Sequence, residues 1–342
     1  MRAKLLLFLE ICKKSCTFAG QMRKNTYIFI GLSLLLLLLS VLDLCSGSVW
    51  ISPCGEWSAM QEQILLHLRL PKMLTAIMAG AALSVAGLMM QTLFRNPLAG
   101  PYILGVSSGA SLGVAIITLC ATFFTQTLLT SNSSIAMAAI VGSTLVLLLV
   151  MAIAKRVRSN VSLLIVGMML GSIAGALVNV MQNFANPDAL KMFIVWTFGS
   201  LSGVSWQEMP ILVGVMLVGC ILVLCLIKPL NGLLLGEDYA RSLGVNVEHT
   251  RWMLVLATGL LAGGITAFCG PIAFIGVAVP HIARGLASSS NHRITVPLSA
   301  LIGANLLLVC DMLCNLGTYP LPISTMSSLF GAPIMIWIIV KK

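Results

Sequence analysis

The chain has 342 residues, of which 58% are hydrophobic and only 9% carry a charge. Soluble domains average roughly 25% charged residues, so this composition excludes a soluble globular protein. Its long apolar runs predict an all-α integral membrane protein instead. The net charge of +10 would suggest a nucleic-acid partner in a soluble protein, and its distribution along the chain decides what it means here.

The N-terminal segment, residues 1–25, carries six Lys and Arg residues around a short apolar run at residues 5–9. A secretory signal needs an apolar run of about 7 residues or more. We therefore expect residues 1–25 to form a basic cytoplasmic segment that lies along the membrane surface. Residues 26–342 are expected to form a single transmembrane domain.

Apolar runs of about 20 residues, separated by charges, Pro or Gly, predict ten transmembrane helices. They lie near residues 26–46, 71–93, 102–121, 134–154, 161–184, 207–227, 252–269, 271–287, 295–315 and 323–340. The division at Gly270-Pro271 cuts one apolar stretch into two short helices, because Gly-Pro is a turn signal and Pro interrupts helix hydrogen bonding.

The distribution of basic residues predicts the orientation of these spans. With the N-terminus in the cytoplasm, 17 of the 20 Lys and Arg residues fall on the cytoplasmic side. Only Arg69, Lys72 and Lys191 fall on the outer side. This asymmetry is what the positive-inside rule predicts. We therefore expect both termini in the cytoplasm and no nucleic-acid partner.

A polar segment at residues 228–251 separates two of the apolar spans. Gly236 precedes two acidic residues, as at a helix N-terminus. Gly244 is placed as a left-handed helix stop, and Asn246 is placed to cap a second short helix. Two helices joined at a glycine are either a docking element for another protein or a solvated connector, and the local pattern does not decide between them.

Few other residues in the spans suggest chemistry. Asp43 and Asp311 are acidic residues within the spans, both near outer helix ends, where helix packing and a place on a substrate path are both open. The ten cysteines include no metal-ligand set, so no metal site is expected. Cys45 and Cys54 would meet on the outer side, where a disulfide is a testable alternative to two free thiols.

The sequence resembles the permease subunits of the ABC importers that take up ferric siderophores, haem and cobalamin, the FecCD-type family. The resemblance runs from about residue 60 to the C-terminus. It rests on motifs in the family's order: RLPK, QTLFRNPLAGPYILGVSSGA, LLLGEDYARSLGVNV, CGPIAFIGVAVPHIAR and GAPIMIW. It implies a type II ABC importer permease with ten transmembrane helices in the lipid of a bacterial cytoplasmic (inner) membrane. It further implies a homodimer with a second permease copy, two cytoplasmic ATPase subunits and an extracytoplasmic solute-binding protein.

The resemblance also implies roles for particular residues. The segment near 236–250 would form cytoplasmic coupling helices that contact the ATPase. Their contact residues would be Glu237, Asp238, Tyr239, Ala240, Arg241, Leu243, Gly244, Val245 and Asn246. Arg69 and Lys72 match a basic pair that docks the binding protein. The cytoplasmic gate would consist of Asn96, Leu98, Asn160 and Val161.

One departure from the family pattern concerns the ninth predicted helix. It ends in CDMLCN, so Asn315 stands where the family commonly has an Arg that docks the binding protein. One arm of that contact is therefore missing, and the sequence leaves the cargo open among a siderophore, haem and cobalamin.

The function that the resemblance implies is ATP-driven import of a bulky iron chelate (a ferric siderophore or haem) or of cobalamin. This chain has no P-loop, so ATP-Mg would be bound and hydrolysed by the partner ATPase, and the permease itself would be neither an enzyme nor the holder of a cofactor. The alternative is a stand-alone gradient-driven secondary transporter or channel, which usually needs intramembrane ionisable groups. An intramembrane enzyme is not expected, because the four histidines fall at or outside the edges of the spans.

Overall fold

The structure is a computed structural model that describes residues 2–47, 51–52, 58–119, 132–154, 156–157, 159–315 and 321–340. Every regular element in these ranges is a helix. In chain order they are α1 (Arg2–Cys45), α2 (Ala59–Ile64), the π-helix η1 (Leu65–Arg69), α3 (Leu70–Phe94), the 3-10 helix η2 (Pro101–Leu104), α4 (Val106–Leu119), α5 (Asn132–Ala154), α6 (Asn160–Phe184), α7 (Pro187–Thr197), α8 (Met209–Leu233), α9 (Glu237–Ser242), α10 (Val247–Cys269), α11 (Ile275–Ala287), α12 (His292–Cys314) and α13 (Ile323–Val340).

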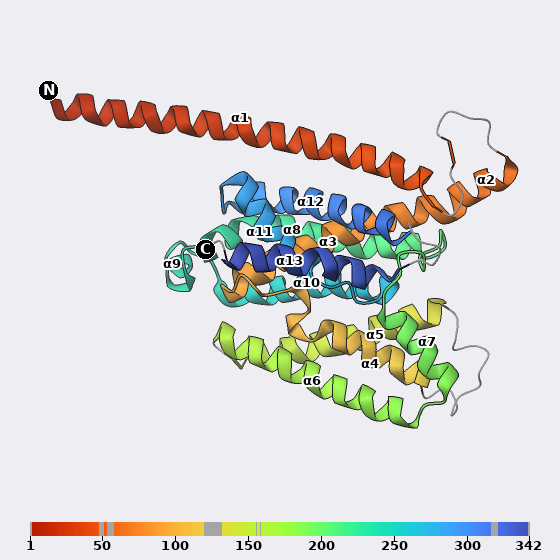
Figure 1. Ribbon diagram of the computed structural model, residues 1–342. Helices are drawn as coiled ribbons and strands as arrows, with labels where there is room; N and C mark the ends of the chain where they lie inside the picture. The colour runs from red at the N-terminus through yellow and green to blue at the C-terminus, as the bar shows by residue number, and fades with distance from the viewer. Residues whose placement is uncertain are drawn as a thin grey trace.

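The helices form one bundle whose centre is α3 and α10 (Figure 1). α3 packs against α10, α11 and α12, and α10 packs against α5 and α8. α4, α5, α6 and α7 form a second group on one side, while α1 runs along α12 on the other (Figure 1). The start of α1, the end of α13 and α9 lie at one end of the molecule, and α2 and α7 lie at the opposite end (Figure 1).

Burial separates the central helices from those that face lipid. α3 and α10 are apolar on all sides and mostly buried, as expected for helices inside a bundle. α1, α6 and α8 instead expose large apolar side chains such as Leu37, Met169 and Leu217. Apolar surfaces of this extent are stable against lipid tails, so these three helices form an outer layer of the bundle.

Small residues let α3 approach its neighbours closely. A Cβ atom on Gly80 would lie 2.2 Å from the carbonyl oxygen of Gly303 in α12, and one on Gly87 would lie 1.7 Å from the carbonyl oxygen of Gly276 in α11. Any larger residue at either position would push the helices apart. Backbone contact of this kind is the usual reason for small residues between membrane helices.

Each of the ten predicted spans coincides with a helix. Within the described ranges, seven helices are long and apolar enough to cross a membrane, and α4, α11 and α13 are shorter apolar helices. The count of ten crossings therefore stays a prediction. The predicted break at Gly270 is confirmed, since this residue ends α10 with a φ of +73° before α11 begins.

The structure also has local features that were not predicted. The basic segment 1–25 and the first predicted span belong to one helix, because α1 is continuous from Arg2 to Cys45. Lys and Arg are good helix formers and the segment contains no Pro, so its charges do not interrupt the helix. The helices α2, η1 and α7 were not predicted. For α7 a signal was present: the side chain of Asn186 accepts a hydrogen bond from the N–H of Ala189 at 2.9 Å, and Pro187 follows the cap.

Candidate functional site

The short helix α9 is formed by local signals at both of its ends. Gly236 precedes it with a φ of +122°, a conformation that favours glycine. Two carboxylates occupy its first turn and Arg241 its last, which suits the helix dipole. Gly244 turns the chain with a φ of +82°, and the Asn246 side chain caps α10 by accepting a hydrogen bond from the N–H of His249 at 3.0 Å. These caps were predicted correctly, but the expected second short helix is the first turn of the long helix α10.

One face of α9 is exposed and the other is buried. Ala240 is fully buried, whereas Tyr239 and Leu243 are 52% and 58% exposed beside the charged Asp238 and Arg241. Aromatic, aliphatic and Arg side chains gathered on a free surface are typical of protein–protein contacts. The nine residues predicted to contact an ATPase therefore lie together at this end of the molecule, but they are divided between the two faces.

A cavity of about 920 Å³ opens beside α9. Its polar lining includes Arg156, Arg241, His249 and Glu248, together with the buried Arg251. Basic groups outnumber the carboxylate in this lining. A concave basic surface next to the exposed face of α9 suits acidic side chains of a partner protein.

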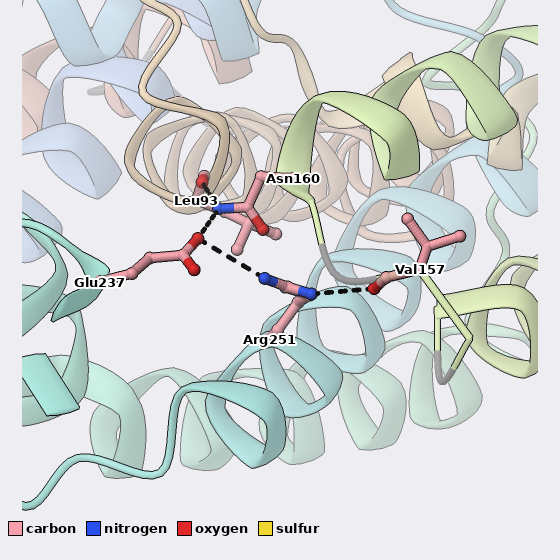
Figure 2. A network of polar contacts seen from close by, with 5 residues as sticks. All are labelled: Leu93, Val157, Asn160, Glu237 and Arg251. Atoms are coloured by element: carbon pink, nitrogen blue, oxygen red, sulfur yellow. Dashed lines mark hydrogen bonds and ion pairs between the residues drawn. The ribbon is translucent and has the colours of Figure 1, made fainter.

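Glu237, the first residue of α9, points toward α3 and α6 (Figure 2). Its Oε1 atom accepts a hydrogen bond from Asn160 Nδ2 at 2.5 Å and lies 3.5 Å from Arg251 Nη2. Arg251 Nη1 in turn donates to the carbonyl of Val157 at 3.2 Å. The Arg251 side chain is only 6% exposed, so the carboxylate compensates a buried charge. One side chain thus joins α9 to α10 and to the start of α6.

Asn160 also holds the end of α3. Its Nδ2 atom donates to the carbonyl of Leu93 at 2.8 Å (Figure 2). In a continuing helix this carbonyl would accept from the N–H four residues later, but that residue is Pro97, which has no N–H. The Asn160 amide supplies the missing donor, and it thereby ties the N-terminus of α6 to the C-terminus of α3.

The predicted gate residues fall at this junction. Asn96 and Leu98 occupy the turn after α3, where Asn96 Oδ1 accepts a hydrogen bond from the Leu98 N–H at 2.9 Å. Val161 follows Asn160 in the first turn of α6, and both Leu98 and Val161 are exposed. The four residues therefore surround the adjoining ends of α3 and α6. Their role as a constriction stays a prediction.

A second polar cluster lies near the end of the bundle that carries α2. Lys72 Nζ forms an ion pair with Asp311 Oδ1 at 2.9 Å, and the two side chains are 18% and 4% exposed. Asn315 Nδ2 donates to the backbone carbonyl of Asp311 at 2.7 Å. Arg69 Nη1 donates to the carbonyl of Leu44 at 2.8 Å. The ion pair joins α3 to α12, which favours the helix-packing interpretation of Asp311.

These contacts bear on the residues predicted to dock a binding protein. Lys72 is largely buried and its charge is engaged within the chain, so it has a structural role that the sequence analysis did not find. Arg69, Asp43 and Asn315 line a cavity of about 250 Å³ beside the ion pair. Docking at Arg69 and Lys72 stays a prediction. The predicted alternative of a disulfide at Cys45 involves Cys54, which lies outside the described residues.

Two arginines that the sequence analysis used only for orientation belong to the α9 site. Arg251 is buried one turn into α10. The Arg95 guanidinium packs against the N-terminus of α9, because a Cβ atom on Gly236 would lie 2.8 Å from Arg95 Nη2. A cation in the first turns of an apolar span indicates a buried charge that needs a partner, so Arg251 could have been identified from the sequence as such a charge. Its partner, Glu237, could not have been identified, because the packing of α9 against α10 determines which carboxylate lies close to Arg251.

The apolar bundle, with its seven helices of membrane-spanning length in the described ranges, defines the class of protein: a multi-pass integral membrane protein. The fold matches that of a chain in a solved structure described as an inward-facing conformation of a metal-chelate type ABC transporter. The TM-score is 0.84 at 29% sequence identity, and the match covers 93% of this chain and 100% of the other.

The model of the FecCD transport family matches residues 35–341, and the chain belongs to this family. Two relatives carry the name vitamin B12 import system permease protein BtuC. The one from Vibrio cholerae is 37% identical over 330 residues, which cover 94% of this chain and 95% of the relative. The one from Salmonella paratyphi A is 39% identical over 330 residues, which cover 95% of this chain and 99% of the relative.

Proposed function

We propose that the chain is the permease subunit of an ATP-driven importer for a bulky metal chelate, and that its cargo is cobalamin. The ATP-driven part is supported by the exposed face of α9, which offers Asp238, Tyr239, Arg241 and Leu243 to a cytoplasmic partner. The cargo is supported by two relatives, 37% and 39% identical over nearly the whole chain, that are named for vitamin B12 import.

The mechanism follows from linkage between two sites. Two permease copies would form the channel, a solute-binding protein would deliver the cargo from outside, and two ATPase subunits would bind at α9. ATP favours the closed ATPase pair, and α9 moves with it. The nucleotide therefore biases the permease between outward-open and inward-open forms, because a ligand shifts an equilibrium by its differential affinity for the two states. The binding protein supplies affinity, so the channel itself needs only weak binding.

Cargo competition tests the assignment of cobalamin. The complete importer, with its ATPase and binding protein, is reconstituted in liposomes and supplied with labelled cyanocobalamin. We expect an excess of unlabelled cyanocobalamin to abolish uptake of the label. Equal concentrations of haem or of a ferric siderophore should change the uptake of labelled cyanocobalamin by no more than about twofold, because a site built for one chelate binds another more weakly by several kcal/mol. Uptake of haem or a siderophore in preference to cyanocobalamin would reject cobalamin as the cargo while leaving the permease assignment intact.

A further inference from the structure

We infer that Glu237 is a positioning residue that transmits movement of α9 to the predicted gate, and that it does not contact the ATPase. This inference rests on the proposed function, because it assigns one residue of the coupling helix to transmission inside the permease. Glu237 and Ala240 are three residues apart and share the face of α9 that is turned toward the bundle. Asp238 and Arg241 share the exposed face, so neighbouring residues of one helix have different partners.

Glu237 reaches both predicted gate segments through a single amide. Asn160 Nδ2 carries two hydrogens, and it donates to Glu237 Oε1 at 2.5 Å and to the Leu93 carbonyl at 2.8 Å (Figure 2). Asn160 is itself a predicted gate residue, and Leu93 lies in the last turn of α3, directly before the turn that carries Asn96 and Leu98. Rotation of the one amide would break both contacts together.

A second contact, between Arg95 and Gly236, also connects α9 to the end of α3. Arg95 ends α3 in a left-handed conformation, with a φ of +47°, and its guanidinium packs against Gly236 at the start of α9. The N-terminus of α9 therefore touches α3 through Arg95 and touches α6 through Glu237. A displacement of α9 acts on both segments at once.

The charge of Glu237 makes this connection strong. Arg251 is buried, and the Glu237 carboxylate lies 3.5 Å from its Nη2 atom as a partner of opposite charge. Hydrogen bonds of an ionised group are about twice as strong as neutral ones, and the Asn160–Glu237 bond at 2.5 Å is of this kind, whereas Arg251 at 3.5 Å adds an electrostatic attraction. N–H···O hydrogen bonds have donor–acceptor distances of roughly 2.7–3.2 Å. A displacement of α9 by about 1 Å must therefore either carry Asn160 with it or break the bond. We expect the helices to move together.

The connection is tested first on the permease alone, in lipid nanodiscs, by amide hydrogen exchange. Glu237→Gln keeps the shape of the side chain and removes its charge. We expect exchange at residues 95 and 163–166, whose N–H groups are hydrogen-bonded at the ends of α3 and α6, to rise about tenfold, because the substitution turns a charge-assisted hydrogen bond into a neutral one and leaves Arg251 without this carboxylate. Asn160→Ala, which breaks the same link without removing a charge, should give the same result. Asp238→Asn, the adjacent carboxylate on the exposed face, should leave these amides unchanged. Unchanged exchange in both Glu237→Gln and Asn160→Ala would overturn the inference.

Transmission is tested on the permease assembled with its ATPase subunit. Spin labels are introduced at Leu98 and Val161 as unnatural amino acids, and the distance between them is measured with and without ATP. We expect Glu237→Gln to bind the ATPase as the wild type does and to lose the ATP-dependent change in distance, whereas Asp238→Asn should weaken ATPase binding. A Glu237→Gln variant that weakens binding as Asp238→Asn does, or that keeps the full change in distance, would contradict the inference. A wild-type permease that binds no ATPase would instead overturn the proposed function, and the inference with it. The hydrogen-exchange result would still show whether Glu237 is connected to Asn160 and α3.

Discussion

At the scale of single residues, the Lys72–Asp311 ion pair shows how a buried charge and its partner constrain the bundle. Both side chains are largely buried, and they join α3 to α12. Removing one partner of such a pair leaves an uncompensated charge and costs about 3–5 kcal/mol. We predict that Lys72→Met lowers the melting temperature of the purified permease, and that Lys72→Met combined with Asp311→Leu recovers most of the loss.

The matched control for this pair is Lys191→Met, which removes an exposed cation from the same predicted side of the membrane. Thermal unfolding in detergent, followed by tryptophan fluorescence, distinguishes the variants. If Lys72→Met melts at the temperature of Lys191→Met, the ion pair does not stabilise the bundle.

The same pair shows what could be predicted from the sequence at this scale. Asp311 was recognisable as a carboxylate within an apolar span, and Lys72 as one of three cations on the outer side. Their contact was not recognisable, because the packing of helices far apart in the chain determines it. For the same reason Lys72 was assigned to docking and its structural role was missed.

At the scale of elements, the geometry of α9 depends on Gly244. This residue has a φ of +82°, and nothing lies within 4 Å of the position that a Cβ atom would occupy. A side chain there meets no clash, so its cost is that of the left-handed backbone, about 1–2 kcal/mol. We predict that Gly244→Val tilts or frays α9 and weakens ATPase binding without unfolding the bundle.

Gly285 provides the matched control for Gly244. It also has open space around its Cβ position, but it lies inside α11 with a helical backbone. Gly285→Ala should leave ATPase binding unchanged and stabilise the protein slightly, by about 0.5–1 kcal/mol. Surface plasmon resonance with the ATPase subunit measures both variants. Wild-type affinity of Gly244→Val for the ATPase would show that the shape of α9 does not determine docking.

Element ends were the most predictable part of the fold. Gly236, Gly244, Asn246 and Gly270 each end or begin a helix as their residue types indicate, since caps act over a few neighbouring residues. That α1 continues through the basic segment 1–25 was not predicted, because hydropathy marks where an apolar span begins and not where its helix begins. Lys, Arg and Glu favour helix about as much as Leu does.

At the scale of the whole molecule, the sequence predicted where apolar helices lie but not how they pack. Hydropathy identifies a span, whereas the central place of α3 depends on small residues that permit backbone contact with its neighbours, as between Gly80 and Gly303 of α12. The start of α1, the end of α13 and α9 lie at one end (Figure 1), as the distribution of Lys and Arg requires if that end is cytoplasmic.

The central claim is that this chain is a passive gate operated through α9 by an ATPase. The most direct measurement is accumulation of labelled cyanocobalamin in proteoliposomes with the binding protein supplied, compared with and without the ATPase subunit and ATP. We predict accumulation only when the ATPase and ATP are both present. Accumulation should be lost when Asp238 and Arg241 are both replaced by Ala, and kept in Arg293→Ala, which removes an exposed cation at the same end outside α9. Accumulation against a gradient by this chain without an ATPase would contradict the account and identify a secondary transporter.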